Sequence, residues 1–255
     1  MTTVLLRPLV TLAAGSLVCW AALAQAPMGM PSPPSGVNAR MAKFFGDIKA
    51  FSAKAETRVL DKSSKETIAM TTAFAMLDGK TRTELDLTQV KGAQMPPGSG
   101  DMMKQIGMDK MVALTVPNKK SAFLIYPTMK AYAEMPLAEE ETVSSEEEYK
   151  IEKTPIGKET IDGHDCAKNK VTLTNKKGEK FEATVWNAAD LKDFPIQMQM
   201  TEKDTTLITR YKDIQFAKPD EKQFNPPDGY TRHANMQQLM QAAIQKMMGG
   251  PGGNN

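Results

Sequence analysis

The sequence predicts a mainly β protein of the α+β class, with one antiparallel sheet and a helix near each end. Three observations predict it. Apolar residues alternate with period two through most of residues 51–216, turn-forming residues separate these runs, and helical spacing of apolar residues occurs before and after them. The net charge is +2 and the charged residues are spread along the 255-residue chain. Without a basic stripe to neutralise phosphates, nucleic acid is not expected as a partner.

The first 24 residues have the features of a secretory signal peptide. Arg7 precedes an apolar run over residues 9–23, and the small-residue pattern Ala-Leu-Ala ends at Ala24. The alternative is a retained membrane anchor, but the run is shorter than the roughly 20 residues that a spanning helix needs. We therefore expect cleavage after Ala24, no transmembrane anchor in the mature protein, and a periplasmic or secreted location.

The remaining chain is expected to hold one domain. Residues 25–36 are rich in proline and glycine and predict a flexible leader. A single β-rich domain is expected over residues 37–232, followed by an amphipathic helix over 233–248 and a disordered tail over 249–255. Cys166 is the single cysteine after the expected cleavage, so no internal disulfide can form.

A first helix is expected at the start of this domain, with Ser35 as its N-cap. The apolar residues that follow recur at steps of three and four and share one helix face: Val37, Met41, Phe44, Phe45 and Ile48.

Alternation then predicts a meander of strands, in which Asp78-Gly79 indicates a tight hairpin. The expected strands are 51–60, 66–77, 81–87, 110–116, 121–127, 130–135, 157–161, 166–174, 180–186, 196–202, 205–211 and 212–216. Residues 91–108 interrupt the pattern with two prolines and four glycines, which predicts a mobile or functional loop such as a lid. The six glutamates within residues 138–148 predict a solvated loop.

The mature chain contains no nucleophile elbow, helical pair of zinc-binding histidines, phosphate loop or dinucleotide fingerprint. Its most enzyme-like cluster is His164-Asp165-Cys166, but residues this close along a strand or turn seldom aim a nucleophile and a base at each other. We expect Asp162-Gly163-His164-Asp165 to form a turn between two strands and Cys166 to enter the sheet as a small buried hydrophobe. Neither an enzyme nor a cofactor is predicted.

Methionine stands out, with 19 residues. One interpretation is Cu(I) binding, because thioethers are soft ligands and Met28-x-Met30 and Met198-x-Met200 have the spacing of extracytoplasmic copper carriers. The other is an adaptable apolar surface, since methionine side chains fill irregular spaces. Met198 and Met200 share one face of a strand with Ile196, which suits a core or a cavity wall.

The C-terminal helix has a capping-box pattern in Asn235 and Gln238, and Gly249-Gly250 ends it. Its apolar stripe offers candidate residues for binding another envelope protein: Met236, Leu239, Met240, Ile244 and Met247.

Four segments resemble a family of uncharacterised exported bacterial proteins, domain of unknown function 4412: residues 110–136, 156–173, 185–200 and 224–230. The pattern also looks like the wider superfamily of periplasmic lipoprotein carriers, the LolA and LolB fold. That resemblance implies a curved antiparallel sheet forming a half-open barrel, with helices covering its open side and an apolar cavity between them.

These expectations favour a non-catalytic periplasmic binding protein that holds a lipid, an acyl chain or another apolar ligand in the half-barrel. Alternation alone assigns eight candidates to the cavity wall: Phe74, Met76, Met111, Phe123, Ile125, Trp186, Met198 and Met200. The same residues would serve equally well as a packed core. The alternatives are an envelope interaction protein that docks through its C-terminal helix, and a Cu(I)-binding protein.

Overall fold

The computed structural model describes residues 42–92, 98–137, 149–176 and 178–249. All of them belong to one compact unit, residues 35–255. The expected signal peptide, the leader, the acidic segment and most of the tail lie outside the described residues. Within the described ranges, no helix has both the length and the apolar character needed to cross a membrane.

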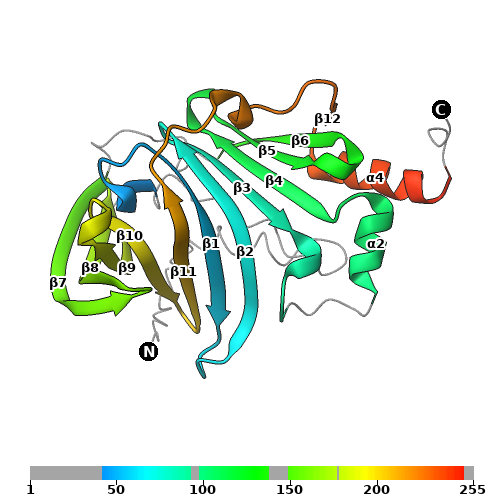
Figure 1. The fold of residues 1–255 in the computed structure, drawn as a ribbon. Helices are drawn as coiled ribbons and strands as arrows, with labels where there is room; N and C mark the ends of the chain where they lie inside the picture. Colours follow the sequence, from blue (N-terminus) through cyan, green and yellow to red (C-terminus); the bar gives the residue numbers. More distant parts are fainter. Residues whose placement is uncertain (1–41, 93–97, 138–148, 177, 250–255) are drawn as a thin grey trace, which may run out of the picture. The chain divides into compact units, whose positions relative to one another are not determined.

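Twelve strands of the described residues form one curved, open sheet (Figure 1), which confirms the mainly β prediction. The first meander contains β1 (Ala50–Leu60), β2 (Glu66–Leu77), β3 (Lys80–Asp86), β4 (Lys110–Val116), β5 (Ser121–Tyr126) and β6 (Ala131–Pro136). The second contains β7 (Tyr149–Ile161), β8 (His164–Asn175), β9 (Lys180–Ala188), β10 (Phe194–Glu202) and β11 (Thr205–Gln215). Pairing of β1 with β11 joins the two meanders. The short β12 (Thr231–His233) pairs in parallel with β6 at one edge, and β7 forms the other edge.

The tight turns follow from local sequence. Asp78 and Gly79 have φ of 49° and 79°, and Asp162 and Gly163 have φ of 50° and 85°. Two successive residues with positive φ form the hairpin turn whose twist matches that of the flanking strands, and aspartate followed by glycine tolerates this conformation best. The turn predicted at Asp78-Gly79 is confirmed, and the one predicted over residues 162–165 is shorter, because β8 begins at His164.

Residues 91–108, which were predicted to form a loop or a lid, contain a helix in their described part. Residues 99–106 form the helix α2 (Ser99–Ile106), which ends at Gly107 with φ of 75°. Met103, Ile106 and Met108 are buried. The prediction of a loop is wrong for this part, because residues 99–106 are helical and two apolar side chains of the helix are buried. The strand predicted over 212–216 is also not separate, since β11 continues through Asp213 at a bulge.

The two terminal helices differ in extent from the prediction. Of the first helix, the described residues contain the α-helical Ala42 and the 3-10 turn η2 (Lys43–Phe45), which Gly46 ends with φ of 58°, so Ile48 lies beyond it. Val37 and Met41 lie outside the described residues. The second, α4 (Met236–Met247), has the predicted cap, in which Asn235 Oδ1 accepts from the Gln238 amide at 2.9 Å. Helix α4 contacts β6 and α2. The described residues also contain the 3-10 turns η3 (Leu87–Gln89), η4 (Pro117–Lys119), η5 (Pro127–Met129), η7 (Ala189–Leu191) and η8 (Glu221–Phe224).

Candidate functional site

The strand register divides the side chains of the sheet between two faces. We name face A the face shared by Phe51, Phe74 and Tyr211, and face B the opposite one. Residues opposed in an antiparallel pair share a face, so the pairings carry this assignment across the sheet. From β1 to β5 the opposed residues on face A are Ala53, Phe74, Thr83, Ala113 and Leu124. In the other direction, from β1 through β11 and β10 to β9, the opposed residues on face A are Thr57, Thr209, Met198 and Val185.

Part of face A is filled by an aromatic cluster centred on Phe45. The turn η2 places this ring over the sheet, where it is 3% exposed. Four other rings have their centroids 4.7 to 6.3 Å from that of Phe45: Phe51, Phe194, Tyr211 and Phe74. All four are buried. Aromatic rings at these separations pack closely, so this part of face A is a core and not a cavity.

Beyond this cluster, towards the β1–β2 and β10–β11 turns, face A is partly exposed. Val59 is opposed by Ile68 on one side and by Leu207 on the other, and Leu207 is opposed by Met200. These four residues form a contiguous apolar line across β2, β1, β11 and β10, which we name the open row. Each of them is half-buried. The open row is therefore an apolar surface that borders a filled core and keeps part of its area accessible.

Methionines are concentrated on the same face. All six methionines in the described strands lie on face A: Met70, Met76, Met111, Met135, Met198 and Met200. Unbranched thioether side chains adapt to ligands of varied shape, which makes face A a pliable apolar surface. Met28 and Met30, the other half of the copper interpretation, lie outside the described residues.

The eight predicted wall residues do not share one wall, which corrects the sequence interpretation. Five lie on face A: Phe74, Met76, Met111, Met198 and Met200. Phe123 and Ile125 lie on face B, because they are opposed by Leu114 and Val112. Trp186 also lies on face B, opposed by Gln197, and its Nε1 donates to Glu159 Oε2 at 2.8 Å. Alternation gives the period of a strand but does not say which set of residues joins which face of a distant strand.

Face B of the first meander is a packed core. Phe123 and Ile125 are buried with neighbours on β4, and Tyr230 from the segment after β11 packs against them. Phe224 of η8 is 1% exposed and packs against Ala75 and Leu77. The segment that closes the domain therefore covers this part of face B.

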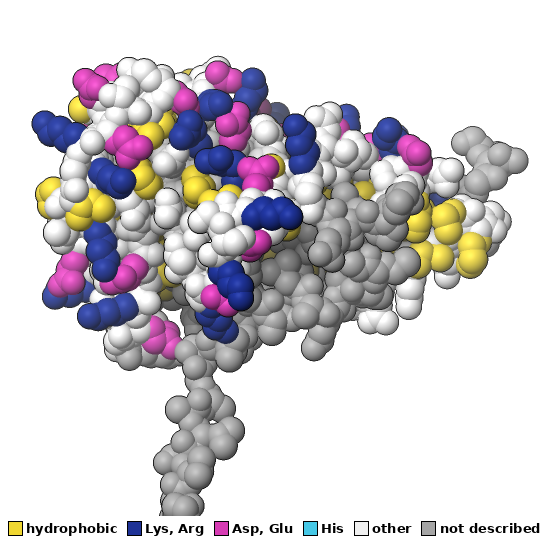
Figure 2. Space-filling model, turned by 90° about the horizontal axis from the view of Figure 1, so that it is seen from below, with side chains coloured by type: hydrophobic (Ala, Val, Ile, Leu, Met, Phe, Trp, Pro, Cys, Tyr) yellow, Lys and Arg dark blue, Asp and Glu magenta, His cyan; other side chains and the backbone are white. Residues whose placement is uncertain are grey.

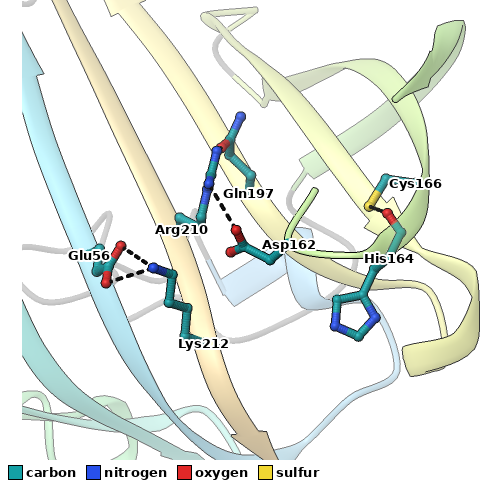
Figure 3. Close-up of polar contacts among 7 residues, drawn as sticks. All are labelled: Glu56, Asp162, His164, Cys166, Gln197, Arg210 and Lys212. Carbon is teal, nitrogen blue, oxygen red and sulfur yellow. Dashed lines mark hydrogen bonds and ion pairs between the residues drawn. The ribbon is translucent and has the colours of Figure 1, made fainter. Parts of the chain in front are cut away.

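A second buried apolar cluster, which includes Trp186, Cys166 and Ala188, lies on face B of β8 and β9. Another part of face B is polar. Around β1, β10 and β11, Lys212 Nζ lies 2.9 Å from Glu56, and the Arg210 guanidinium donates to Gln197 Oε1 at 2.7 Å (Figure 3). Arg210 also lies 3.2 Å from Asp162.

A groove of about 690 Å³ opens on face B beside this polar area, floored by Ala73 and Ala75. Its charged side chains are paired with each other, Lys54 with Asp213 at 2.7 Å and Arg82 with Glu84 at 2.8 Å. The groove thus differs in face and in chemistry from the apolar cavity that the resemblance implies.

The apolar stripe of α4 is largely buried against other parts of the same chain. Leu239 is fully buried, while Met236, Met240 and Ile244 are half-buried. Met247 is 48% exposed at the end of the helix, where hydrophobic side chains gather in Figure 2. The expectation that the whole stripe faces a partner is therefore wrong, since most of it packs against β6 and α2.

In the cluster His164-Asp165-Cys166 the thiol is buried as predicted, but His164 and Asp165 already belong to β8 and not to the turn. Cys166 is 2% exposed, and its Sγ donates to the backbone carbonyl of His164 at 3.3 Å (Figure 3). The His164 ring instead lies with Nδ1 2.6 Å from Asp190 Oδ2. Burial raises the pKa of the Cys166 thiol. A buried thiol with a raised pKa that is not paired with the imidazole lacks the arrangement of a cysteine nucleophile and its base.

One family model, domain of unknown function 4412, matches residues 62–194, just over half of the 255-residue chain. The chain belongs to this family. In this member of domain of unknown function 4412, the matched range runs from the β1–β2 turn to the start of β10, so it contains Ile68 but leaves out Val59, Met200 and Leu207. A comparison with curated proteins found no match.

Several solved structures are distantly similar to this family member. A LolA superfamily protein from Nitrosomonas europaea is 10% identical, with 74% of this chain and 98% of that chain covered and a TM-score of 0.38. The lipoprotein LppX from Mycobacterium tuberculosis is 11% identical, with coverage of 68% and 90% and a TM-score of 0.38. A putative outer membrane lipoprotein-sorting protein domain from Vibrio parahaemolyticus is 17% identical, with coverage of 74% and 96% and a TM-score of 0.33. Similarity at this level indicates neither a ligand nor a mechanism for the chain.

Proposed function

We propose that this member of the family is a non-catalytic periplasmic protein that binds a lipid, an acyl chain or another apolar ligand on face A. The observation that carries the proposal is the open row, Ile68, Val59, Leu207 and Met200, which is contiguous, apolar and half-buried. The polar side chains of face B on β1, β10 and β11 are well solvated by water. Transfer of an apolar row from water to a bound ligand, in contrast, lowers the free energy.

The dimensions and chemistry of the row suit an extended hydrocarbon. Four neighbouring strands at about 4.8 Å spacing make the row about 14 Å long. Each methylene that is buried contributes about 0.8 kcal/mol, so about eight methylenes supply roughly 6 kcal/mol before the entropy of ordering the ligand is subtracted. Met200 within the row and Met70 beside Ile68 on β2 add side chains that adjust to the shape of the bound molecule.

Mass spectrometry of the gently purified protein, first native and then after solvent extraction, tests this proposal. We expect a lipid or other apolar molecule at close to one copy per chain. Failure to detect one in protein whose folded state is verified would refute the proposal, and a copper ion in its place would favour the methionine-ligand alternative.

A matched pair of variants tests the location. Leu207 lies on face A in the open row, and the next residue, Ile208, is also half-buried but lies on face B opposite Arg58 and Gln199. Leu207→Gln should lower the content of extracted ligand several-fold, because it places an amide in the apolar row. Ile208→Gln should leave that content unchanged. Equal losses in the two variants would show that the ligand does not contact face A at this row.

A further inference from the structure

The two edges of the sheet differ in how well they are protected. The β12 edge is three residues long and is followed directly by α4. The β7 edge is 13 residues long, and residues 150–160 are all exposed. An exposed strand of this length presents unpaired backbone groups that another strand can pair with. Figure 2 shows lysine or arginine and acidic side chains interspersed over the β7–β10 end of the molecule, without a large area of one sign on this side.

A bulge divides β7 into a longer stretch before Pro155 and a shorter one after it. Pro155 has no backbone N–H, and the register with β8 shifts between Pro155 and Gly157. The longer stretch, residues 149–154, contains Lys150, Ile151 and Glu152. Ile151 is 49% exposed, although it is opposed by the fully buried Leu173 on β8.

The charges of this segment are complementary to a second copy of itself in one register. If the two-fold axis passes through Ile151, each Lys150 is opposite Glu152 of the other copy and the two Ile151 side chains meet. An axis through Glu152 or Lys153 would place like charges opposite each other, and an axis between Ile151 and Glu152 would place Lys150 opposite Lys153. Cross-strand pairs of opposite charge stabilise a sheet and like pairs destabilise it.

We propose that the β7 edge pairs antiparallel with the β7 edge of a second copy of this chain, in the register centred on Ile151. Within the single chain Lys150 Nζ already lies 2.7 Å from Glu152, with the two side chains 74% and 51% exposed. In the pair, each of these charges gains a second partner across the two-fold axis. Face A of both copies lies on the same side of the continued sheet, because residues opposed across the axis have the same alternation. The short segment makes this a weak association, with less than about 1,200 Å² buried in total.

Exchanging the charges tests the register. The purified full chain is compared by sedimentation equilibrium with the variants Lys150→Glu and Glu152→Lys, each alone and mixed in equal amounts. Lys158→Glu is the matched control, since it makes the same charge change on the same exposed strand beyond the bulge. Circular dichroism verifies that each variant is folded.

We expect the wild-type protein and Lys158→Glu to associate with the same dissociation constant. Each of the other variants alone should associate about tenfold more weakly, because two symmetry-related pairs change from opposite to like charges. The equimolar mixture should regain association as a heterodimer, since one copy then carries two carboxylates and the other two ammonium groups. Three results would overturn the proposal: a wild-type protein that stays monomeric at every concentration, a mixture that does not associate, or a control as weak as Lys150→Glu.

Discussion

Replacing Phe45 by alanine should remove the centre of the aromatic cluster that fills part of face A. The ring is 3% exposed and has four ring neighbours within 6.3 Å. Truncating a buried phenylalanine to alanine costs about 3–5 kcal/mol through lost burial and the cavity that remains. For a folded unit of this size each kcal/mol lost from the free energy of unfolding lowers the Tm by about 2–4 °C, so the expected decrease in Tm is about 6–20 °C.

Urea unfolding followed by the fluorescence of Trp186 measures this change. Trp186 is 3% exposed and lies on face B, and the other tryptophan, Trp20, is in the expected signal peptide. Phe44→Ala is the matched control, since Phe44 is the adjacent residue of η2 and its ring lies 6.1 Å from that of Phe181. We expect Phe44→Ala to lower the free energy of unfolding less than Phe45→Ala does.

A loss below about 1 kcal/mol for Phe45→Ala would refute the reasoning, because that is the size of an ordinary substitution. Such a result would mean that the ring does not fill face A in solution. The ligand surface would then extend from the open row over Phe51 and Phe74.

The same unfolding assay checks three further predictions. Gly92→Ala should cost about 3 kcal/mol, because its Cβ would press against the Thr67 carbonyl oxygen at φ of +73°, whereas Gly79→Ala meets open space and should cost about 1 kcal/mol. Asn187→Ala should cost about 2–4 kcal/mol by leaving its buried hydrogen-bond partners unpaired. Burial raises the pKa of Tyr211 above its usual 10.0. The native state therefore keeps a proton that the unfolded chain loses, so stability should fall above that pH, and less so in Tyr211→Phe.

The sequence by itself determined the features that depend on short stretches of chain. Period-two alternation predicted most strands of both meanders close to their observed bounds. It missed residues 149–156 of β7, whose side chains are almost all exposed and so show no alternation, and it missed β12, whose three residues are too few to show a pattern. Asp78-Gly79 predicted its turn because few residues other than glycine, asparagine and aspartate accept positive φ. Asn235 predicted the start of α4, because a helix leaves its first amides without partners inside the helix and a nearby side chain can satisfy them. In each case the deciding interactions join residues a few positions apart.

Only the tertiary structure decided which side chains meet. Phe123 and Trp186 alternate as regularly as Phe74, yet they lie on the opposite face, because register between distant strands assigns the faces. The sequence did not show helix α2, which lies in a glycine-rich stretch, because the packing of its two buried side chains outweighs its weak helical propensity. The open row exists because β1 pairs with β11, a contact also marked by the hydroxyls of Thr57 and Thr209, 3.3 Å apart. Residues so far apart in sequence are brought together by the burial of the whole core, so their pairing cannot be predicted from any short stretch of the sequence.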